Sequence, residues 1–239
     1  MARALRVDLK PDIITYNTVI KSCAKFGNHL LAERWLTRAL QAGLAPDIIT
    51  YTAVIDACAK ARANKEAEKW LSNAVQAGLQ PDITAYNAVI NACARKGEHA
   101  LAGKWLEEAI KAGLRPDIIS YNAIINACAR SGVYSKAEEW FQKAVQAGLK
   151  PDIISYNAVI NACARAGEYF LAEKWLSNAA EAGLRPDIFS YTTLIKAYQR
   201  SPLTVQEKVN KAEQIFQLMS LADVPPNEIF YDTMLKTVG

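Results

Sequence analysis

The sequence has few of the residues that metal sites and covalent catalysis require. Its 239 residues include five cysteines and only two histidines, His29 and His99, which lie far apart in the chain. It contains no zinc-ligand spacing, no phosphate-binding glycine loop and no Ser/His/Asp or Cys/His arrangement. We therefore expect no cofactor, no metal and no small-molecule substrate, and the sequence argues against an enzyme.

Long hydrophobic runs are also missing. No apolar stretch approaches the roughly 18–20 residues that a membrane-spanning helix needs, and the segment from Met1 to Lys10 lacks the apolar centre of a signal peptide. We therefore expect no membrane partner and no targeting peptide in this chain. Hydrophobic residues still make up 51% of the chain, and the net charge of +4 permits a polyanionic partner without requiring one.

What the sequence does contain is one motif repeated every 35 residues. A Pro-Asp pair begins each repeat, and its prolines are Pro11, Pro46, Pro81, Pro116, Pro151 and Pro186. Every cysteine and tryptophan follows the same step: Cys23, Cys58, Cys93, Cys128 and Cys163, and Trp35, Trp70, Trp105, Trp140 and Trp175. A fixed step of this length indicates an array of stacked two-helix units.

The step also defines the expected domain organisation. We predict six repeats, at residues 11–45, 46–80, 81–115, 116–150, 151–185 and 186–225. The sixth carries five extra residues within 201–210, because Ala212 lies further from the proline of its repeat than the corresponding Ala172 lies from its own. Residues 1–10 resemble the tail of a preceding repeat, and residues 226–239 begin a seventh. Both ends therefore indicate a segment of a longer array.

Each repeat is predicted to form two helices. Asp12 can cap the first helix, Tyr16 begins its apolar stripe, and Gly27 can end it in the left-handed conformation. Gly43 ends the second helix in the same way, whereas Arg62 replaces the glycine of its repeat and predicts a different cap there. Because one hairpin cannot bury its own stripe, we predict an all-α fold. This fold is a right-handed α-solenoid, or superhelix, of helix-turn-helix repeats, with the cysteines and tryptophans in its core.

The repeats resemble a known family. The stretch Pro-Asp-Ile-Ile-Ser-Tyr-Asn-Ala-Val-Ile-Asn-Ala-Cys-Ala-Arg-Ala-Gly of residues 151–167 and the Ala-Gly-Leu-Arg-Pro-Asp of residues 182–187 resemble the pentatricopeptide repeat (PPR) family. The resemblance covers about residues 11–239 and fits a P-type array. Tetratricopeptide repeats differ, because they have a shorter step and carry their tryptophan in the first helix. The resemblance implies the same solenoid and a role in RNA processing in an organelle, either the mitochondrion or the chloroplast.

Two polar positions in each repeat are candidates for reading an RNA base. The residue after each tyrosine is a short polar residue with low helix propensity: Asn17, Thr52, Asn87, Asn122, Asn157 and Thr192. It lies about 100° from the tyrosine around the helix, so we expect it outside the core. The residue at the following junction is Asp47, Asp82, Asp117, Asp152, Asp187 or Asn227. The resemblance implies that each junction residue works with the reading residue before it, although ordinary helix capping also explains Asp and Asn here.

Two further positions can hold the rest of a nucleotide. One is mostly apolar and can stack on base faces: Ile14, Ile49, Thr84, Ile119, Ile154 and Phe189. The other is basic and can meet phosphates: Lys25, Lys60, Arg95, Arg130, Arg165 and Arg200. Eleven residues separate the two, three helical turns plus about 20°, so they share a face of the first helix. Compensation of the helix dipole explains the basic residues equally well.

The resemblance implies binding of single-stranded RNA at about one base per repeat. In the family, Asn with Asp favours U, Thr with Asp favours G and Thr with Asn favours A, and the RNA runs 5′ to 3′ from the N-terminal repeat. Applied in order, this rule predicts the site 5′-UGUUUA-3′. Two alternatives stay open, a protein-interaction scaffold of tetratricopeptide-like type and a specificity subunit of a catalytic assembly. Further proteins or repeats beside this segment are open as well.

Overall fold

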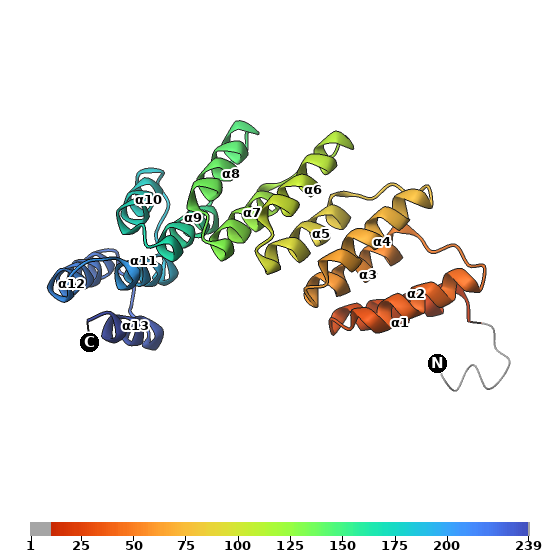
Figure 1. Ribbon diagram of the computed structural model, residues 1–239, viewed down its shortest axis with the longest axis horizontal. Coiled ribbons are helices and arrows are strands. Elements are labelled where there is room, and N and C mark those ends of the chain that lie inside the picture. The colour runs from red at the N-terminus through yellow and green to blue at the C-terminus, as the bar shows by residue number, and fades with distance from the viewer. Residues whose placement is uncertain (1–10, 239) are drawn as a thin grey trace. The chain divides into compact units, whose positions relative to one another are not determined.

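The computed structural model describes residues 11–238, and within them all regular structure is α-helical (Figure 1). The chain divides into two compact units between Pro116 and Asp117. The helices of the first unit are α1 (Ile13–Lys25), α2 (His29–Gln41), α3 (Ile48–Lys60), α4 (Asn64–Gln76), α5 (Ile83–Lys96) and α6 (His99–Lys111). Those of the second are α7 (Ile118–Ser131), α8 (Tyr134–Gln146), α9 (Ile153–Ala166), α10 (Tyr169–Glu181), α11 (Ile188–Arg200), α12 (Val205–Leu221) and α13 (Glu228–Val238).

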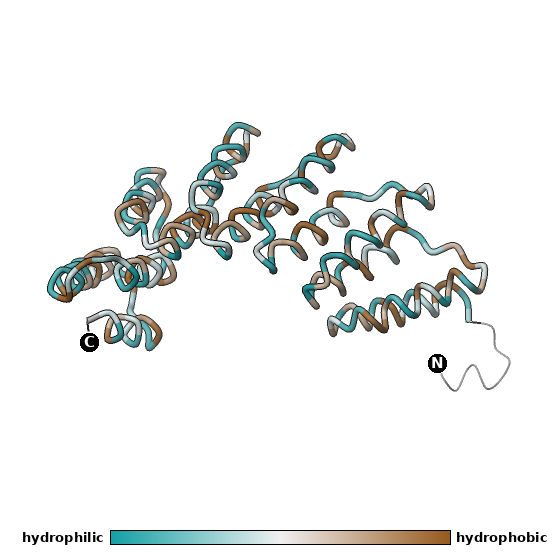
Figure 2. Tube along the Cα trace, in the orientation of Figure 1, coloured by the Kyte–Doolittle hydropathy of each residue, from teal (hydrophilic) through white to brown (hydrophobic). Residues whose placement is uncertain are grey.

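Within each unit the first helices of successive repeats stack directly on one another. In the first unit α3 packs against α1 and α5, and in the second α9 packs against α7 and α11. Within a unit, a second helix packs on the first helix of its own repeat and on the next first helix, as α4 does with α3 and α5. Apolar and polar residues alternate along every helix (Figure 2), which fits helices that bury one side against their neighbours.

The core follows the 35-residue step. One isoleucine in each first helix is fully buried: Ile20, Ile55, Ile90, Ile125, Ile160 and Ile195. Burying such a side chain contributes roughly 1.5–3 kcal/mol, so this row alone accounts for a large part of the packing. The five cysteines are buried and free, and burial raises the pKa of the Cys93 thiol to about 12. Trp70, Trp140 and Trp175 are buried as predicted, whereas Trp35 and Trp105 are half-buried.

Aspartate caps the start of the first helices. Asp12, Asp47, Asp82, Asp117, Asp152 and Asp187 precede α1, α3, α5, α7, α9 and α11, and each carboxylate accepts the backbone N–H three residues on. Such a cap satisfies one of the N–H groups that a helix start leaves unpaired. The capping explanation of these residues is therefore confirmed, whatever further role they have.

The ends of the first helices show where one prediction was wrong. Gly97, Gly132 and Gly167 end α5, α7 and α9 in the left-handed conformation, as expected of glycine. Arg62 was expected to cap differently, yet its φ of 59° puts it in the same conformation. Its N–H bonds the carbonyl of Ala59 at 3.2 Å. The turn geometry thus persists without glycine, at a cost of about 1–2 kcal/mol.

The lengthened repeat differs in its second helix. α12 has 17 residues, whereas α2, α4, α6, α8 and α10 have 13 each. Thr204 begins it with a reciprocal capping box to Glu207. The additional length therefore lies in the second helix, whose Lys208 donates to the carbonyl of Gln199 on α11 at 3.1 Å. Among the described residues, none of the helices combines the length and apolar character needed to span a bilayer.

Candidate functional site

The clearest candidate site joins the first helix of one repeat to the start of the next repeat. Asn157 on α9 donates through Nδ2 to Asp187 Oδ1, at 3.1 Å. The hydroxyl of Ser190 on α11 lies 2.6 Å from Asn157 Oδ1 and 2.9 Å from Asp187 Oδ1. Its oxygen also accepts the backbone N–H of Asp187, at 3.1 Å. The predicted reading residue and junction residue are thus in direct contact, with a serine as third member.

The first unit contains a related arrangement, in which the hydroxyl of Thr50 lies between Asn17 and Asp47. Thr50 Oγ1 lies 2.7 Å from Asn17 Oδ1 and 2.7 Å from Asp47 Oδ1. The Thr50 backbone N–H also donates to Asp47, at 2.9 Å. The hydrogen bond from the Thr50 side chain lowers the pKa of Asp47 below its ordinary value because it stabilises the charged carboxylate. The junction carboxylate at this site is therefore ionised at neutral pH.

Asn122 forms a looser version. Its Nδ2 lies 3.5 Å from Asp152 Oδ1, and Ser155 Oγ donates to the same carboxylate oxygen at 2.9 Å. Among the described residues Asn122 Oδ1 is buried and has no hydrogen-bond partner. A buried amide oxygen without a donor is costly, by roughly 1–3 kcal/mol. The Asn122 amide therefore keeps an acceptor that the described residues leave without a donor.

The two threonine positions are built differently. Thr52 Oγ1 donates to the carbonyl of Ile48 at 2.8 Å, and Thr192 Oγ1 donates to that of Ile188 at 2.6 Å. Asp82 accepts the backbone N–H of Ala85 at 3.0 Å, and Ala85 has no hydroxyl to offer. The threonine hydroxyl is thus satisfied within its own helix, and the junction residue receives no side-chain donor from the third residue of the next helix.

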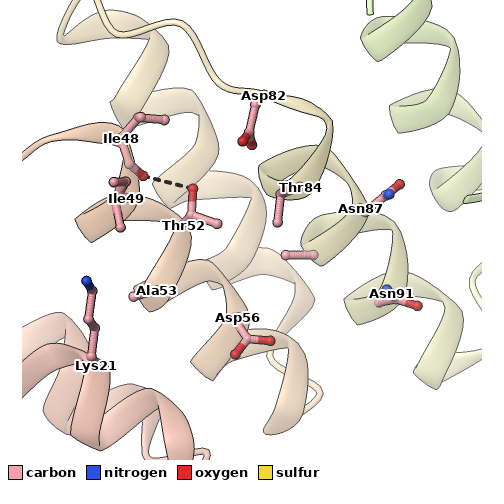
Figure 3. Close-up of a pocket in the computed structure, with 11 residues that line it drawn as sticks. Lys21, Ile48, Ile49, Thr52, Ala53, Asp56, Asp82, Thr84, Asn87 and Asn91 are labelled. Carbon is pink, nitrogen blue, oxygen red and sulfur yellow. Dashed lines mark hydrogen bonds between the residues drawn. The ribbon is translucent and has the colours of Figure 1, made fainter. Parts of the chain in front are cut away.

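A groove opens beside Thr52, with a volume of about 500 Å³. Figure 3 shows Thr52 on α3 between Ile49 on one side and Asp82 and Thr84 at the start of α5 on the other, with the Thr52–Ile48 hydrogen bond dashed. Asn87 lines the same groove from α5. One wall is therefore apolar, and the polar groups of a predicted reading pair converge at one end. The size falls in the range of roughly 300–1,000 Å³ that small-ligand pockets occupy.

The reading residues are more buried than the sequence predicted. Asn17, Thr52 and Asn87 are half-buried, but Asn122 and Asn157 are only 7% and 6% exposed and Thr192 only 5%. The expectation that this position lies outside the core was therefore wrong for the second unit. The reason is tertiary, because the start of the next first helix covers the side chain. The predicted pair Asn87 and Asp117 is divided between the two units. In the first unit Asn87 lines the groove, and in the second Asp117 caps α7.

The predicted stacking residues point into solvent. Ile14 is 69% exposed and Phe189 52% exposed, and Ile49, Thr84, Ile119 and Ile154 are exposed as well. The exposed isoleucines and phenylalanine at this position, which is threonine in α5, gain nothing from the core. Such a row leaves apolar surface available for flat ligand faces.

The basic residues at the ends of the first helices are all exposed. Lys60 Nζ donates to the carbonyl of Ala24 at 3.0 Å and pairs with Asp56 at 2.7 Å. Arg165 donates to the carbonyl of Arg130, at 3.3 Å. These bonds compensate the carbonyl ends of neighbouring helices, as the alternative explanation stated. An arginine has five N–H donors, so it retains donors for a phosphate.

Sequence reasoning missed one group of residues at the site. These are the third residues of the first helices, here called the N3 residues. The N3 residues after an Asn reader are Thr50, Ser120, Ser155 and Ser190, and those after a Thr reader are Ala85 and Phe230. The sequence contained a signal for them, because the N3 residue has a hydroxyl after each Asn reader and none after each Thr reader. It has meaning only once the N3 residue is known to face the preceding reader.

Comparison with known proteins places this arrangement in a family. The PPR repeat family matches residues 11–60, 116–165 and 151–200, the pentatricopeptide repeat domain matches residues 69–131, and the PPR repeat matches residues 49–79. No curated protein sequence matches the chain.

Three solved structures share the fold. PPR10, a maize protein, in complex with an 18-nucleotide psaJ RNA element is 23% identical, with a TM-score of 0.55 over 98% of this chain and 39% of that one. The PPR domain of Arabidopsis thaliana protein-only RNase P 1 in complex with tRNA is 15% identical, with a TM-score of 0.61 over 77% of this chain and 94% of that one. Nuclear proteinaceous RNase P 2 of A. thaliana is 14% identical, with a TM-score of 0.68 over 79% and 42%.

The chain therefore spans about two fifths of the length of PPR10. These likenesses show an all-helical array of paired helices that matches PPR solenoids. Proteins of the PPR family bind RNA and are often organellar, and their repeat domains are generally non-catalytic. With family matches running from residue 11 to residue 200, this chain belongs to the pentatricopeptide repeat family.

Proposed function

We propose that this chain binds single-stranded RNA, reads about one base per repeat, and prefers 5′-UGUUUA-3′. The observation that carries the proposal is the contact between a reading residue and the next junction aspartate, as between Asn157 and Asp187. The contact occurs at two successive repeats, Asn157–Asp187 and Asn122–Asp152, and each of these pairs has an exposed isoleucine on the reading helix, Ile154 or Ile119. Its proposed role is recognition rather than catalysis, and the proposed target class is a mitochondrial or chloroplast transcript.

The groove beside Thr52 supports one base per interval. A base has flat apolar faces and a polar edge, and the groove has an apolar wall at Ile49 and polar groups at Thr52 and Asp82. A base placed with its face on Ile49 turns its edge toward Thr52 and Asp82. A guanine edge carries two adjacent kinds of N–H donor, and the Asp82 carboxylate is an acceptor without a competing side-chain hydroxyl from Ala85.

The buried oxygen of Asn122 supports a uracil at the asparagine positions. Uracil presents an N–H donor between two carbonyl acceptors, and an asparagine amide presents an oxygen acceptor and N–H donors. Asn122 Oδ1 has no partner within residues 11–238, so a turn of the amide that brings this oxygen to the surface would let the uracil N–H supply the missing hydrogen bond. An unsatisfied acceptor that a ligand completes favours binding of a base that has a donor there.

The relatives make RNA a better candidate than a peptide. Two of the solved structures are complexes with RNA, an 18-nucleotide element and a tRNA. A scaffold that binds peptides needs backbone hydrogen-bonding partners along the groove. The repeated polar pair between exposed apolar side chains instead suits separate planar groups at regular intervals, as single-stranded RNA provides.

The test is a titration against a panel of RNAs. Each RNA carries the hexamer UGUUUA, or a variant with one base changed, at the centre of an otherwise constant strand, and binding is followed by fluorescence anisotropy. We expect each mismatch to weaken binding by about tenfold, in the range of roughly 1–3 kcal/mol known for single DNA-site mismatches. Equal affinity for all hexamers would refute base reading and favour the scaffold.

A further inference from the structure

The N3 residues change together with the reading residues. After each Asn reader the N3 residue of the following first helix carries a hydroxyl, and after each Thr reader it does not. The hydroxyl lies within hydrogen-bond distance of the amide oxygen at two sites, one in each unit, at 2.7 Å for Thr50 and Asn17 and at 2.6 Å for Ser190 and Asn157. At the Asn122 site the hydroxyl of Ser155 bonds Asp152 instead, and among the described residues the amide oxygen has no partner. This coupling needs a physical reason, because helix capping alone accepts Ser, Thr or Ala at N3.

The reason lies in the asymmetry of an amide group. An asparagine side chain offers an acceptor on one side and donors on the other, and a half-turn of the amide exchanges them. At the Asn157 site, Asp187 Oδ1 can only accept, so it faces Nδ2. The Ser190 oxygen accepts the backbone N–H of Asp187, so its single proton is available for Asn157 Oδ1. Carboxylate and hydroxyl together hold the amide at both ends in one orientation.

A threonine reader does not need this second point of attachment. The Thr52 hydroxyl is held by the carbonyl of Ile48 within its own helix. A hydroxyl at residue 85 would instead bond the carboxylate of Asp82, as Ser155 bonds Asp152 at 2.9 Å. It would then occupy an acceptor that faces the groove. Alanine at this position keeps Asp82 open.

We propose that the N3 residue of the following repeat is a third specificity-determining residue, which holds the amide of an Asn reader through its hydroxyl and keeps the junction carboxylate open for a Thr reader through its absence. This inference rests on the proposed function of base reading. The residues assigned to the role are Thr50 and Ser190 for the Asn17 and Asn157 sites, and Ala85 for the Thr52 site. They are positioning residues, since they act on the base through Asn or Asp.

A purely structural explanation makes a different prediction. Ser155 and Ser190 also complete capping boxes at the starts of α9 and α11, which stabilises a helix whatever RNA is present. Thr15 separates the two explanations, because it bonds Asp12 through its hydroxyl at 2.6 Å but follows no reading residue of this chain. If N3 hydroxyls only cap helices, Thr15→Ala and Ser190→Ala should behave alike toward RNA.

The decisive experiment converts the Thr52 site into an Asn site, once by changing the reader alone and once by changing the reader and the N3 residue together. Wild type, Thr52→Asn, Ala85→Ser and the double variant are each titrated with UGUUUA and UUUUUA in the same flanking strand. We expect Thr52→Asn alone to lose the preference for G with only a weak preference for U. The double variant should prefer U by about tenfold, the usual size of one base mismatch. Ala85→Ser alone should weaken binding of UGUUUA and leave UUUUUA unchanged.

The outcomes separate the two proposals. If Thr52→Asn alone prefers U as strongly as the double variant, the N3 inference is wrong and base reading stands. If wild type binds both RNAs equally, base reading itself fails. The reverse pair, Asn157→Thr with and without Ser190→Ala, repeats the test in the second unit against a G at the fifth base. Thermal melts of each variant control for loss of fold. RNA titrations of Thr15→Ala control for the loss of a helix-capping hydroxyl.

Discussion

Thr52 and Asn157 occupy the same position of their repeats, yet their surroundings differ in almost every polar contact. Thr52 bonds its own helix and faces an aspartate that is capped by a backbone N–H. Asn157 bonds the next junction aspartate and shares it with a serine hydroxyl. The residue one turn further along is also different, an aspartate at Asp56 and an asparagine at Asn161.

The difference shows how one backbone can present two kinds of polar edge. Both sites use the same helix start and an exposed isoleucine beside it, Ile49 or Ile154. What changes is the side-chain network, which is open at Thr52 and closed at Asn157. A closed network fixes one amide orientation, whereas an open one leaves a carboxylate free for donors on the ligand. Base preference is thus expected to depend on several residues from two repeats rather than on the reader alone.

The largest expected effect bears on what the two sites share. Both need an exposed base face, which base pairing hides, so annealing UGUUUA to its complement should weaken binding by at least about 100-fold, given stacking worth roughly 1–3 kcal/mol per base. The measurement compares the single strand and its duplex by fluorescence anisotropy at equal salt. Equal affinity for the two forms would mean that neither site contacts base faces.

The next largest effect is a difference between the two sites in how much the loss of the junction aspartate destabilises the fold. Asp82→Ala removes one helix cap and should lower the free energy of unfolding of its unit by about 1 kcal/mol. Asp187→Ala removes the same cap and also the partner of buried Asn157 and Ser190. It should cost roughly 1–3 kcal/mol more, because polar groups in a buried network are left unpaired. Urea-induced unfolding followed by circular dichroism measures both changes.

Asp12→Ala is the matched control for that comparison. Asp12 caps α1 and bonds Thr15, and within residues 11–238 it contacts no reading residue. Its loss should resemble that of Asp82. Were Asp187→Ala no more destabilising than Asp12→Ala, the closed network around Asn157 would add nothing to ordinary capping.

Much of this architecture was predictable from the sequence, and the exceptions have clear physical causes. The step of Cys58 and Trp70 predicted stacked hairpins, because periodicity reports which face is buried. The left-handed turn at Arg62 was not predictable, since backbone hydrogen bonds from Arg62 to Ala59 and from Ala63 to Cys58 accompany a conformation that arginine by itself disfavours. The burial of Asn122 and the contact between Ser190 and Asn157 depend on how successive repeats meet. Periodicity within one helix cannot report that geometry.

A smaller effect concerns the charges near the two kinds of site. Lys60, in the Thr52 repeat, pairs with Asp56 at 2.7 Å, whereas Arg165, in the Asn157 repeat, bonds a backbone carbonyl at 3.3 Å. Arg165→Gln should reduce the slope of log affinity against log salt by about 0.7, the value per phosphate contact on a single strand. Lys60→Gln should reduce it less, because Asp56 already offsets that charge.

The wild-type slope sets the scale for these variants. Six phosphate contacts at roughly 0.7 each would give a slope near −4, and ion pairs such as Lys60–Asp56 should make the observed slope shallower. The measurement is a series of RNA titrations between low and physiological salt. A slope of zero would mean that the basic residues serve only the helix ends.

The smallest effect tests whether the closed network reaches the junction carboxylate. The hydroxyl of Thr50 lowers the pKa of Asp47, so Thr50→Val, which keeps the shape and removes the hydroxyl, should raise that pKa toward its ordinary value. A carboxyl whose pKa is lowered by folding stabilises the folded state above its unfolded pKa, and this contribution is lost as the pH falls through the folded pKa. Wild type should therefore have a higher free energy of unfolding than Thr50→Val near neutral pH, and this difference should disappear in acid.

Thr52→Val is the matched control, because the Thr52 hydroxyl bonds the carbonyl of Ile48 and its loss should leave Asp47 unaffected. An NMR titration of the Asp47 carboxyl in the three proteins gives the answer. Unchanged titration in Thr50→Val would show that the N3 hydroxyl does not act on the junction residue, and the distinction between closed and open sites would lose its electrostatic basis.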